Sequence, residues 1–244
     1  MPRGGPRASC LDRLLQTDRL EYLDRDATGD PDLLARKRSV VRALERTGEF
    51  FGNHERFAAI ALREIADVPD PRILELGSGH GGLSAKLLEM HPTAHVTVTD
   101  LEPASVDAIA AGDLGRDPRA TVRVMDATAI DAPDGHYDLA VFALSFHHLP
   151  PAAASRVFAE GTRVATTLLV IDLPRPPAPL HLVRLATMLP FAPFVPFVHD
   201  GMISSLRCYS GSALRALAAH ADPAIRVEMR NGLTTPQVVL ATRH

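Results

Sequence analysis

The sequence has no tryptophan and only two cysteines and two lysines among its 244 residues. Cys10 and Cys208 stand far apart and in no C-x-x-C spacing. They therefore predict neither a disulfide framework nor a zinc site, and they suit a reducing compartment. The 26 basic residues do not outnumber the 29 acidic ones, which argues against a dedicated nucleic-acid-binding protein. We expect a cytoplasmic protein with no nucleic-acid partner, and no signal peptide because the charged N-terminus precedes no apolar run.

The sequence also lacks an uninterrupted apolar run of membrane-spanning length. The most apolar stretch, from Ala178 to Val198, contains Arg184 and prolines at positions 190, 193 and 196. Those prolines interrupt any helix of the roughly 20 residues that cross a bilayer. We predict no membrane span, and we interpret residues 173–206 as a lid over a substrate.

From Pro71 onward, short apolar runs alternate with helical patterns. Strands separated by helices predict a parallel sheet covered on both faces, and the last two strands should pair antiparallel because a short loop joins them. We therefore expect an α/β fold: a doubly wound, Rossmann-like sheet of seven strands in residues 71–244, preceded by an N-terminal helical cap of residues 1–70. The expected strands are residues 72–76, 95–99, 121–125, 137–143, 167–171, 225–229 and 237–242.

A glycine-rich loop follows the first expected strand, and it reads Glu75-Leu76-Gly77-Ser78-Gly79-His80-Gly81-Gly82. Glycines let a backbone turn tightly and approach a ligand closely, and the helix that follows offers amide donors. The loop also satisfies G-x-G-x-x-G, so alone it does not distinguish a nicotinamide cofactor from others. Asp100 ends the second strand, where it can bond ribose hydroxyls, and Asp126 ends the third, where it can accept from an adenine amino group.

Taken together, these residues resemble the class I S-adenosylmethionine-dependent methyltransferases, whose acid-x-Gly-x-Gly-x-Gly loop is matched by Glu75, Gly77, Gly79 and Gly81. The resemblance covers residues 71–244 and implies S-adenosylmethionine as the cofactor, with S-adenosylhomocysteine as its product. A nicotinamide-dependent dehydrogenase remains an alternative. The cofactor-binding residues that the resemblance implies are Glu75, Gly77, Ser78, Gly79, Gly81, Asp100, Leu101, Asp126, Ala127 and Ala143.

The residues after the fourth strand, Ala143 to Pro150, bear on the methyl acceptor. They lack the Asp/Asn-Pro-Pro-Tyr/Phe motif of methyltransferases that act on bases or glutamine, and their Ser-Phe-His-His-Leu stretch is similar to the small-molecule branch. A hydroxyl acceptor must lose its proton, and a histidine can take it. We name His147 and His148 as candidate catalytic bases; in the other interpretation His148 caps or packs against the next helix.

Further polar and apolar residues are candidates for a supporting role. His181, His199 and Asp200 could join the histidine pair in a metal site, but no ligand spacing supports one, so we expect no metal. Asn53, His54 or Arg56 should lie nearest the cofactor. Arg38, Arg42 and Arg46 form either a solvated helix face or a site for an anionic partner. An apolar wall for an aromatic or lipidic acceptor, or packing on the core, is expected from Leu182, Leu185, Met188, Leu189, Phe191, Phe194 and Phe197.

The sequence therefore predicts methyl transfer to a hydroxyl of a small metabolite such as a phenol, a quinone or a sugar. Methylation of nitrogen or carbon is the nearest alternative. A protein that keeps the cofactor but does not methylate is another. The partner is a small-molecule acceptor, and a homodimer is one possible oligomeric state.

Overall fold

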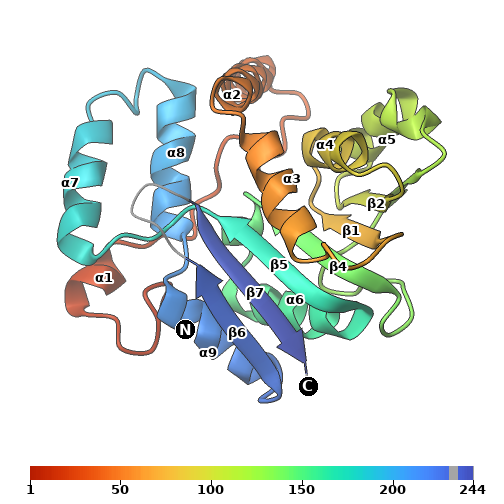
Figure 1. The fold of residues 1–244 in the computed structure, drawn as a ribbon. Coiled ribbons are helices and arrows are strands. Elements are labelled where there is room, and N and C mark those ends of the chain that lie inside the picture. The colour runs from red at the N-terminus through yellow and green to blue at the C-terminus, as the bar shows by residue number, and fades with distance from the viewer. Residues whose placement is uncertain (231–235, 244) are drawn as a thin grey trace. The chain divides into compact units, whose positions relative to one another are not determined.

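The computed structural model describes residues 1–230 and 236–243, apart from the side chains of residues 45 and 49 (Figure 1). The chain divides into two compact units. One unit combines residues 1–53 with residues 173–214, and the other combines residues 54–172 with residues 215–244. We call them the N-terminal unit and the sheet unit. The helical cap of residues 1–70 and the lid of residues 173–206 stay predictions.

The sheet unit is built on one seven-stranded sheet with the order β3-β2-β1-β4-β5-β7-β6. Strands β1 to β5 run parallel, and β7 runs antiparallel to both of its neighbours. The predicted fold class is confirmed. Because the chain crosses from β3 at one edge to β4 beside β1, a crevice is expected at the carboxyl ends of β1 and β4. The strands are β1 (Arg72–Leu76), β2 (His95–Asp100), β3 (Ala120–Val124), β4 (Tyr137–Ala143), β5 (Ala165–Asp172), β6 (Ile225–Arg230) and β7 (Gln237–Arg243).

Helices cover both faces of this sheet. On one face, Phe57, Leu83 and Ile109 pack with strand residues such as Ile73 and Val141, all of them buried. On the other face, α6 packs against β4, β5 and β7. The central strands are almost entirely apolar because neither of their faces meets water. The helices are α3 (Asn53–Arg63), α4 (Gly82–Met90), α5 (Pro103–Ala111), α6 (Pro151–Val164) and α9 (Gly211–Ala221), which the unit boundary crosses, with 3-10 turns η1 (Leu114–Arg116) and η2 (Phe146–His148).

The N-terminal unit is helical. It contains α1 (Cys10–Leu14), α2 (Pro31–Phe50), α7 (Ala178–Met188) and α8 (Pro196–Arg207), and α2 packs against α8. Asp30 caps the start of α2, because its Oδ1 accepts the Leu33 N–H at 2.9 Å. Pro196, which we expected to interrupt a helix, instead occupies the first position of α8, where a missing N–H is harmless. Within the described residues, no helix is long and apolar enough to cross a membrane.

A buried arginine joins the two segments of the N-terminal unit. The Arg175 guanidinium donates to the carbonyl oxygens of Asp12 at 3.0 Å and Leu15 at 2.6 Å. It also donates to those of Leu206 at 3.3 Å and Cys208 at 3.2 Å. Burial lowers the Arg175 pKa, because a guanidinium away from water loses hydration. The Arg175 side chain therefore connects residues near the start of the chain with the segment that follows β5.

Candidate functional site

The loop between β1 and α4 has a shape that only glycine adopts without strain. Gly77, Gly79 and Gly81 have φ angles of 63°, 58° and 75°. A Cβ on Gly77 would lie 2.7 Å from the Phe142 ring, and one on Gly81 would lie 2.6 Å from Leu114 Cδ1, so these two glycines are needed for packing. A Cβ on Gly79 would meet no described atom within 4 Å. Gly79 therefore faces open space, where a ligand can reach the backbone.

Two acids lie at the carboxyl ends of the neighbouring strands. Asp100 Oδ2 accepts the Gly79 N–H at 2.8 Å, and its Oδ1 accepts the Glu102 N–H at 2.9 Å. Each carboxylate oxygen has a second lone pair, so both remain able to accept from hydroxyl groups. Asp126 is exposed after β3, with Oδ1 accepting the Thr128 N–H at 2.7 Å. The apolar Leu101 beside Asp100 is 66% exposed, which suits contact with a flat ring.

Glu75 in β1 is buried beneath the loop. Its Oε2 accepts a hydrogen bond from the Ser84 hydroxyl of α4. Burial raises the Glu75 pKa from 4.5 to about 7, the negative charge of Asp100 adds to this, and the Ser84 hydrogen bond opposes it. Because a buried charge is costly, this carboxyl exchanges its proton near neutral pH.

A histidine–aspartate pair lies beyond the carboxyl ends of β4 and β5. His147 is buried, and its backbone N–H donates to Asp172 Oδ2 at 2.8 Å. Its ring Nδ1 lies 2.7 Å from Asp172 Oδ1. Since an aspartate only accepts, Nδ1 carries the proton and Nε2 is the basic nitrogen of the neutral ring. Leu144, just before this turn, is the one described non-glycine residue with a positive φ, at 56°. Strained backbone of this kind is concentrated at functional sites.

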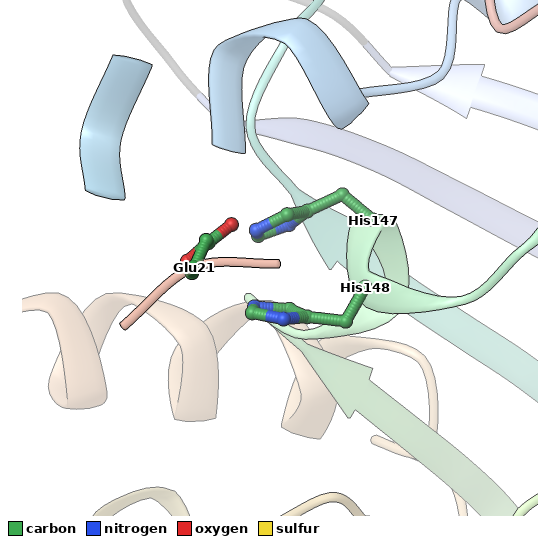
Figure 2. A group of neighbouring side chains, drawn as sticks. All are labelled: Glu21, His147 and His148. Atoms are coloured by element: carbon green, nitrogen blue, oxygen red, sulfur yellow. The ribbon is translucent and has the colours of Figure 1, made fainter. Parts of the chain in front are cut away.

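The two candidate bases differ in their surroundings. Figure 2 shows the rings of His147 and His148 projecting side by side from η2. Their centroids lie 4.4 Å apart, with 37° between the ring planes. His148 is half-buried, whereas His147 is buried and bonded to Asp172. Within the sheet unit, the Asp172 carboxylate orients the His147 ring. Asp172 is not among the site residues predicted from the sequence, although its place at the end of β5 was a signal.

The other polar candidates belong to the interior of the N-terminal unit. His181 is fully buried, and its Nε2 lies 3.0 Å from Ser205 Oγ. Burial, together with the nearby arginines, lowers the His181 pKa to about 4. Asp200 accepts the Tyr22 N–H at 2.9 Å and lies 2.9 Å from His199 Nδ1. These contacts hold helices and loops of that unit together.

Comparisons with known proteins agree with this geometry. Residues 73–167 match the protein family described as a methyltransferase domain. The malonyl-[acyl-carrier protein] O-methyltransferase of Geobacter sulfurreducens is 34% identical over 137 residues, which are 52% of this chain and 49% of that enzyme. The match thus spans about half of that enzyme. The demethylmenaquinone methyltransferase of Thermus thermophilus is 26% identical over 225 residues, 86% of this chain and 90% of that enzyme.

Solved structures share the fold. A SAM-dependent methyltransferase from Aquifex aeolicus has a TM-score of 0.52 at 19% identity, covering 70% of this chain and 81% of that one. The plantazolicin methyltransferase BpumL, crystallised with S-adenosylhomocysteine and a monoazolic desmethylPZN analog, has a TM-score of 0.66 at 11% identity, covering 95% of this chain and 97% of that one. A matched methyltransferase domain thus coincides with the glycine loop, the strand-end acids and the seven-stranded sheet. The chain therefore contains a segment, residues 73–167, that matches the methyltransferase-domain family, and it shares the fold of solved S-adenosylmethionine-dependent methyltransferases.

Proposed function

We propose that this protein transfers a methyl group from S-adenosylmethionine to a hydroxyl oxygen of a small apolar metabolite. The observation that carries the proposal is the His147–Asp172 pair at the carboxyl edge of the sheet. Methyl transfer to a nitrogen lone pair needs no such base, whereas a hydroxyl oxygen reacts well only when it loses its proton.

We assign the cofactor to the carboxyl ends of β1, β2 and β3 in the sheet unit. Gly77, Ser78 and Gly79 would hold its methionine part, because the loop faces open space at Gly79. Asp100 has free lone pairs for the ribose hydroxyls, and the adenine would lie between the exposed Leu101 and Asp126. When bound, the cofactor supplies a methyl group activated by a positively charged sulfur. Supporting contacts are assigned to Glu75, Gly81, Ala127 and Ala143.

The chain contributes alignment and proton transfer. His147 Nε2 takes the proton of the acceptor hydroxyl, so the oxygen becomes more nucleophilic as it approaches the methyl carbon. Asp172 holds the ring in the required tautomer and stabilises the positive charge that the ring gains. The hydroxyl proton ends on His147 and leaves to water after product release.

An apolar acceptor is favoured by the surface of the N-terminal unit. Leu182, Leu189, Phe191 and Phe194 are each at least half exposed on α7 and the loop that follows. Large apolar side chains left exposed in this number are typical of a binding surface. The two relatives act, by their names, on a malonyl thioester carrier and on a quinone precursor. A hydroquinone ring, which carries a hydroxyl that the His147–Asp172 pair can deprotonate, therefore heads the list of acceptors.

Carbon methylation of a hydroxylated ring is the second candidate. The Thermus relative, which matches over most of this chain, is named for a quinone-ring substrate. Removing a proton from a ring hydroxyl also makes the ring carbon beside it nucleophilic. The same His147–Asp172 pair would therefore serve this reaction.

Turnover with acceptor panels tests the proposal. The protein is incubated with S-adenosylmethionine and separate sets of phenols, hydroquinones, carboxylic acids, amines and thiols. Mass spectrometry detects the methylated product, and NMR locates the methyl group on oxygen or carbon. Methylation of amines alone would overturn the assignment of His147 as a base. Thermal stabilisation by NAD but not by S-adenosylhomocysteine would overturn the cofactor assignment.

A further inference from the structure

Residues 177–195 of the N-terminal unit expose an unusual number of large apolar side chains. They comprise the N-cap residue of α7, α7 itself and the loop before α8, and we call them the apolar segment. Phe194 is 83% exposed. Leaving such side chains in water forgoes the free energy that burial would provide, so the segment is suited to an apolar surrounding. Those that are at least half exposed are Leu180, Leu182, Val183, Leu189, Phe191 and Phe194.

The apolar segment also carries no negative charge. Between Asp172 and Asp200 the sequence has no acidic residue, and its charged residues there are Arg175 and Arg184. Arg175 is buried against backbone carbonyl oxygens, and Arg184 is half-buried on α7. A specific protein–protein interface usually has a polar rim around its apolar core. The segment supplies little for such a rim, which favours a lipid surface over a protein as its partner.

Helix α2 adds positive charge to the same unit. Residues 33–44 contain Arg36, Lys37, Arg38 and Arg42 and no acidic residue, and over its whole length α2 has five basic and three acidic residues. The arginines at 36, 38 and 42 are exposed and make no ion pair within the described part of the chain. Because the formal charge of the whole chain is −3, this excess is local. It favours an anionic partner over a merely solvated face.

Both features are attached to α8. Helix α2 and helix α7 each pack against it, and in Figure 1 α2 and the loop between α7 and α8 both lie toward the upper end of α8. Apolar side chains that enter the head-group boundary, together with basic residues that attract anionic head groups, are typical of proteins that bind at a membrane surface. One unit thus combines the two parts of such a contact.

We propose that the N-terminal unit docks on the surface of anionic lipid bilayers. The apolar segment enters the head-group region, with Phe191 and Phe194 as its largest exposed side chains, and Arg38 and Arg42 of α2 attract anionic head groups. The inference extends the proposed function, because an apolar hydroquinone dissolves in a bilayer and would be met there. Docking itself needs neither cofactor nor acceptor, so it is measured separately from methyl transfer.

Cosedimentation of the full-length chain with lipid vesicles tests the proposal. Vesicles of phosphatidylcholine alone are compared with equimolar phosphatidylcholine and phosphatidylglycerol, and we expect at least about tenfold tighter binding to the anionic mixture, weakening as salt is raised. The double variant Arg38→Gln, Arg42→Gln should bind the mixture about 10- to 30-fold more weakly. The double variant Phe191→Ser, Phe194→Ser should lose about tenfold or more, because its polar side chains gain little from entering the boundary.

Matched controls place the same changes on the sheet unit. Arg215→Gln, Arg226→Gln removes two exposed arginines and gives the same net charge as the α2 variant. Met90→Ser, Val124→Ser replaces two exposed apolar side chains. Both controls should bind vesicles like the wild type. Thermal unfolding should show that all four variants remain folded.

The other outcomes overturn the proposal, each in its own way. No binding of the wild type to either vesicle would refute docking, and equal binding to both would remove the role of α2. Equal losses in the two arginine variants would show an effect of net charge alone. A dimer that the phenylalanine variant loses, without vesicle binding, would make the apolar segment an interface between two copies. Binding to single-stranded RNA in place of vesicles, lost in the α2 variant, would assign the arginines to nucleic acid.

Discussion

Asp172 accepts two hydrogen bonds from one residue, with Oδ2 on the backbone N–H of His147 and Oδ1 on its ring Nδ1. The first bond holds the turn after β4, and the second holds the ring that the turn presents. A base held at both points loses little freedom when an acceptor arrives, which favours the reactive alignment. The Asp172 carboxylate thus fixes both the position of the His147 backbone and the tautomer of the His147 ring.

Removing the proposed base should slow the reaction without affecting the cofactor. We expect His147→Ala to lower turnover about 100-fold or more, because a positioned general base contributes that much, and to leave S-adenosylhomocysteine affinity unchanged. His148→Ala should cost less than about tenfold. Steady-state kinetics and calorimetry on both variants check this. The reverse order of losses would assign the base to His148, and small losses in both would refute a histidine base.

Asp172 is expected to act through His147. Asp172→Asn keeps the side-chain size but lets the amide bond the ring in the wrong tautomer, so we expect kcat to fall about 100-fold with little change in KM. Because the two residues act together, the double variant Asp172→Asn, His147→Ala should be no slower than His147→Ala alone. Additive losses in this kinetic cycle would show that Asp172 has a separate role.

The open space at Gly79 predicts a selective loss of binding. Gly79→Arg should abolish S-adenosylhomocysteine binding, because the side chain fills the space that the cofactor needs. Gly135→Arg is the matched control, since Gly135 has a similar φ of 60°, also meets no described atom within 4 Å, and lies before β4 at the opposite edge of the sheet. Thermal unfolding should show similar stability for both variants. Wild-type affinity in Gly79→Arg would place the cofactor elsewhere.

Glu75 should make the stability of the fold depend on pH. Its pKa is about 7 in the folded chain against 4.5 for the ordinary group, so between these values the folded state holds more protons than the unfolded state. The contribution of Glu75 to the free energy of unfolding is therefore fully present below about pH 4.5. It is lost as pH rises through 7, and the loss amounts to about 3 kcal/mol. Urea unfolding at several pH values should show a steeper decline in the wild type than in Glu75→Gln.

Every other titrating group is present in both proteins. The difference between the wild-type and Glu75→Gln curves therefore reports the contribution of Glu75 alone. Glu102→Gln, which changes an exposed glutamate, serves as the control and should follow the wild type. Parallel curves for the wild type and Glu75→Gln would mean that the Glu75 carboxyl is already ionised well below neutral pH.

Arg175 should stabilise the N-terminal unit in particular. Arg175→Ala leaves four carbonyl oxygens without their donor, and we expect a loss of about 3 kcal/mol. Hydrogen exchange should rise in residues 1–53 and 173–214 and stay low in the central strands. Arg38→Ala, at an exposed position of α2, should cost less than about 0.5 kcal/mol. Unchanged exchange in Arg175→Ala would show that other contacts hold the two segments together.

Local patterns were sufficient to predict the sheet and much of the loop. β1 has the predicted bounds, because Gly77 ends its apolar pattern sharply. Asp172 was harder to recognise, since an acid at a strand end is common. Only the pairing of Ala143 in β4 with Ile171 in β5 brings it beside His147.

The division of the chain into two units could not be predicted from local sequence patterns, for a similar reason. The bond from Arg175 to the Leu15 carbonyl joins residues 160 positions apart, and no periodicity reports such a contact. Pro196 is another residue whose structural role could not be predicted from the sequence. A proline that stops one helix also begins another well, and the sequence alone does not distinguish the two outcomes.

The N-terminal unit is built from two segments of the chain that are synthesised at different times. Its first segment leaves the ribosome long before residues 173–214 exist, so α1 and α2 must wait for most of the parallel sheet to be translated before they gain their packing partners. Contacts that are so distant along the chain form slowly. A shortened chain that begins at residue 54 would therefore keep its sheet but leave α7 and α8 without the segment that Arg175 binds.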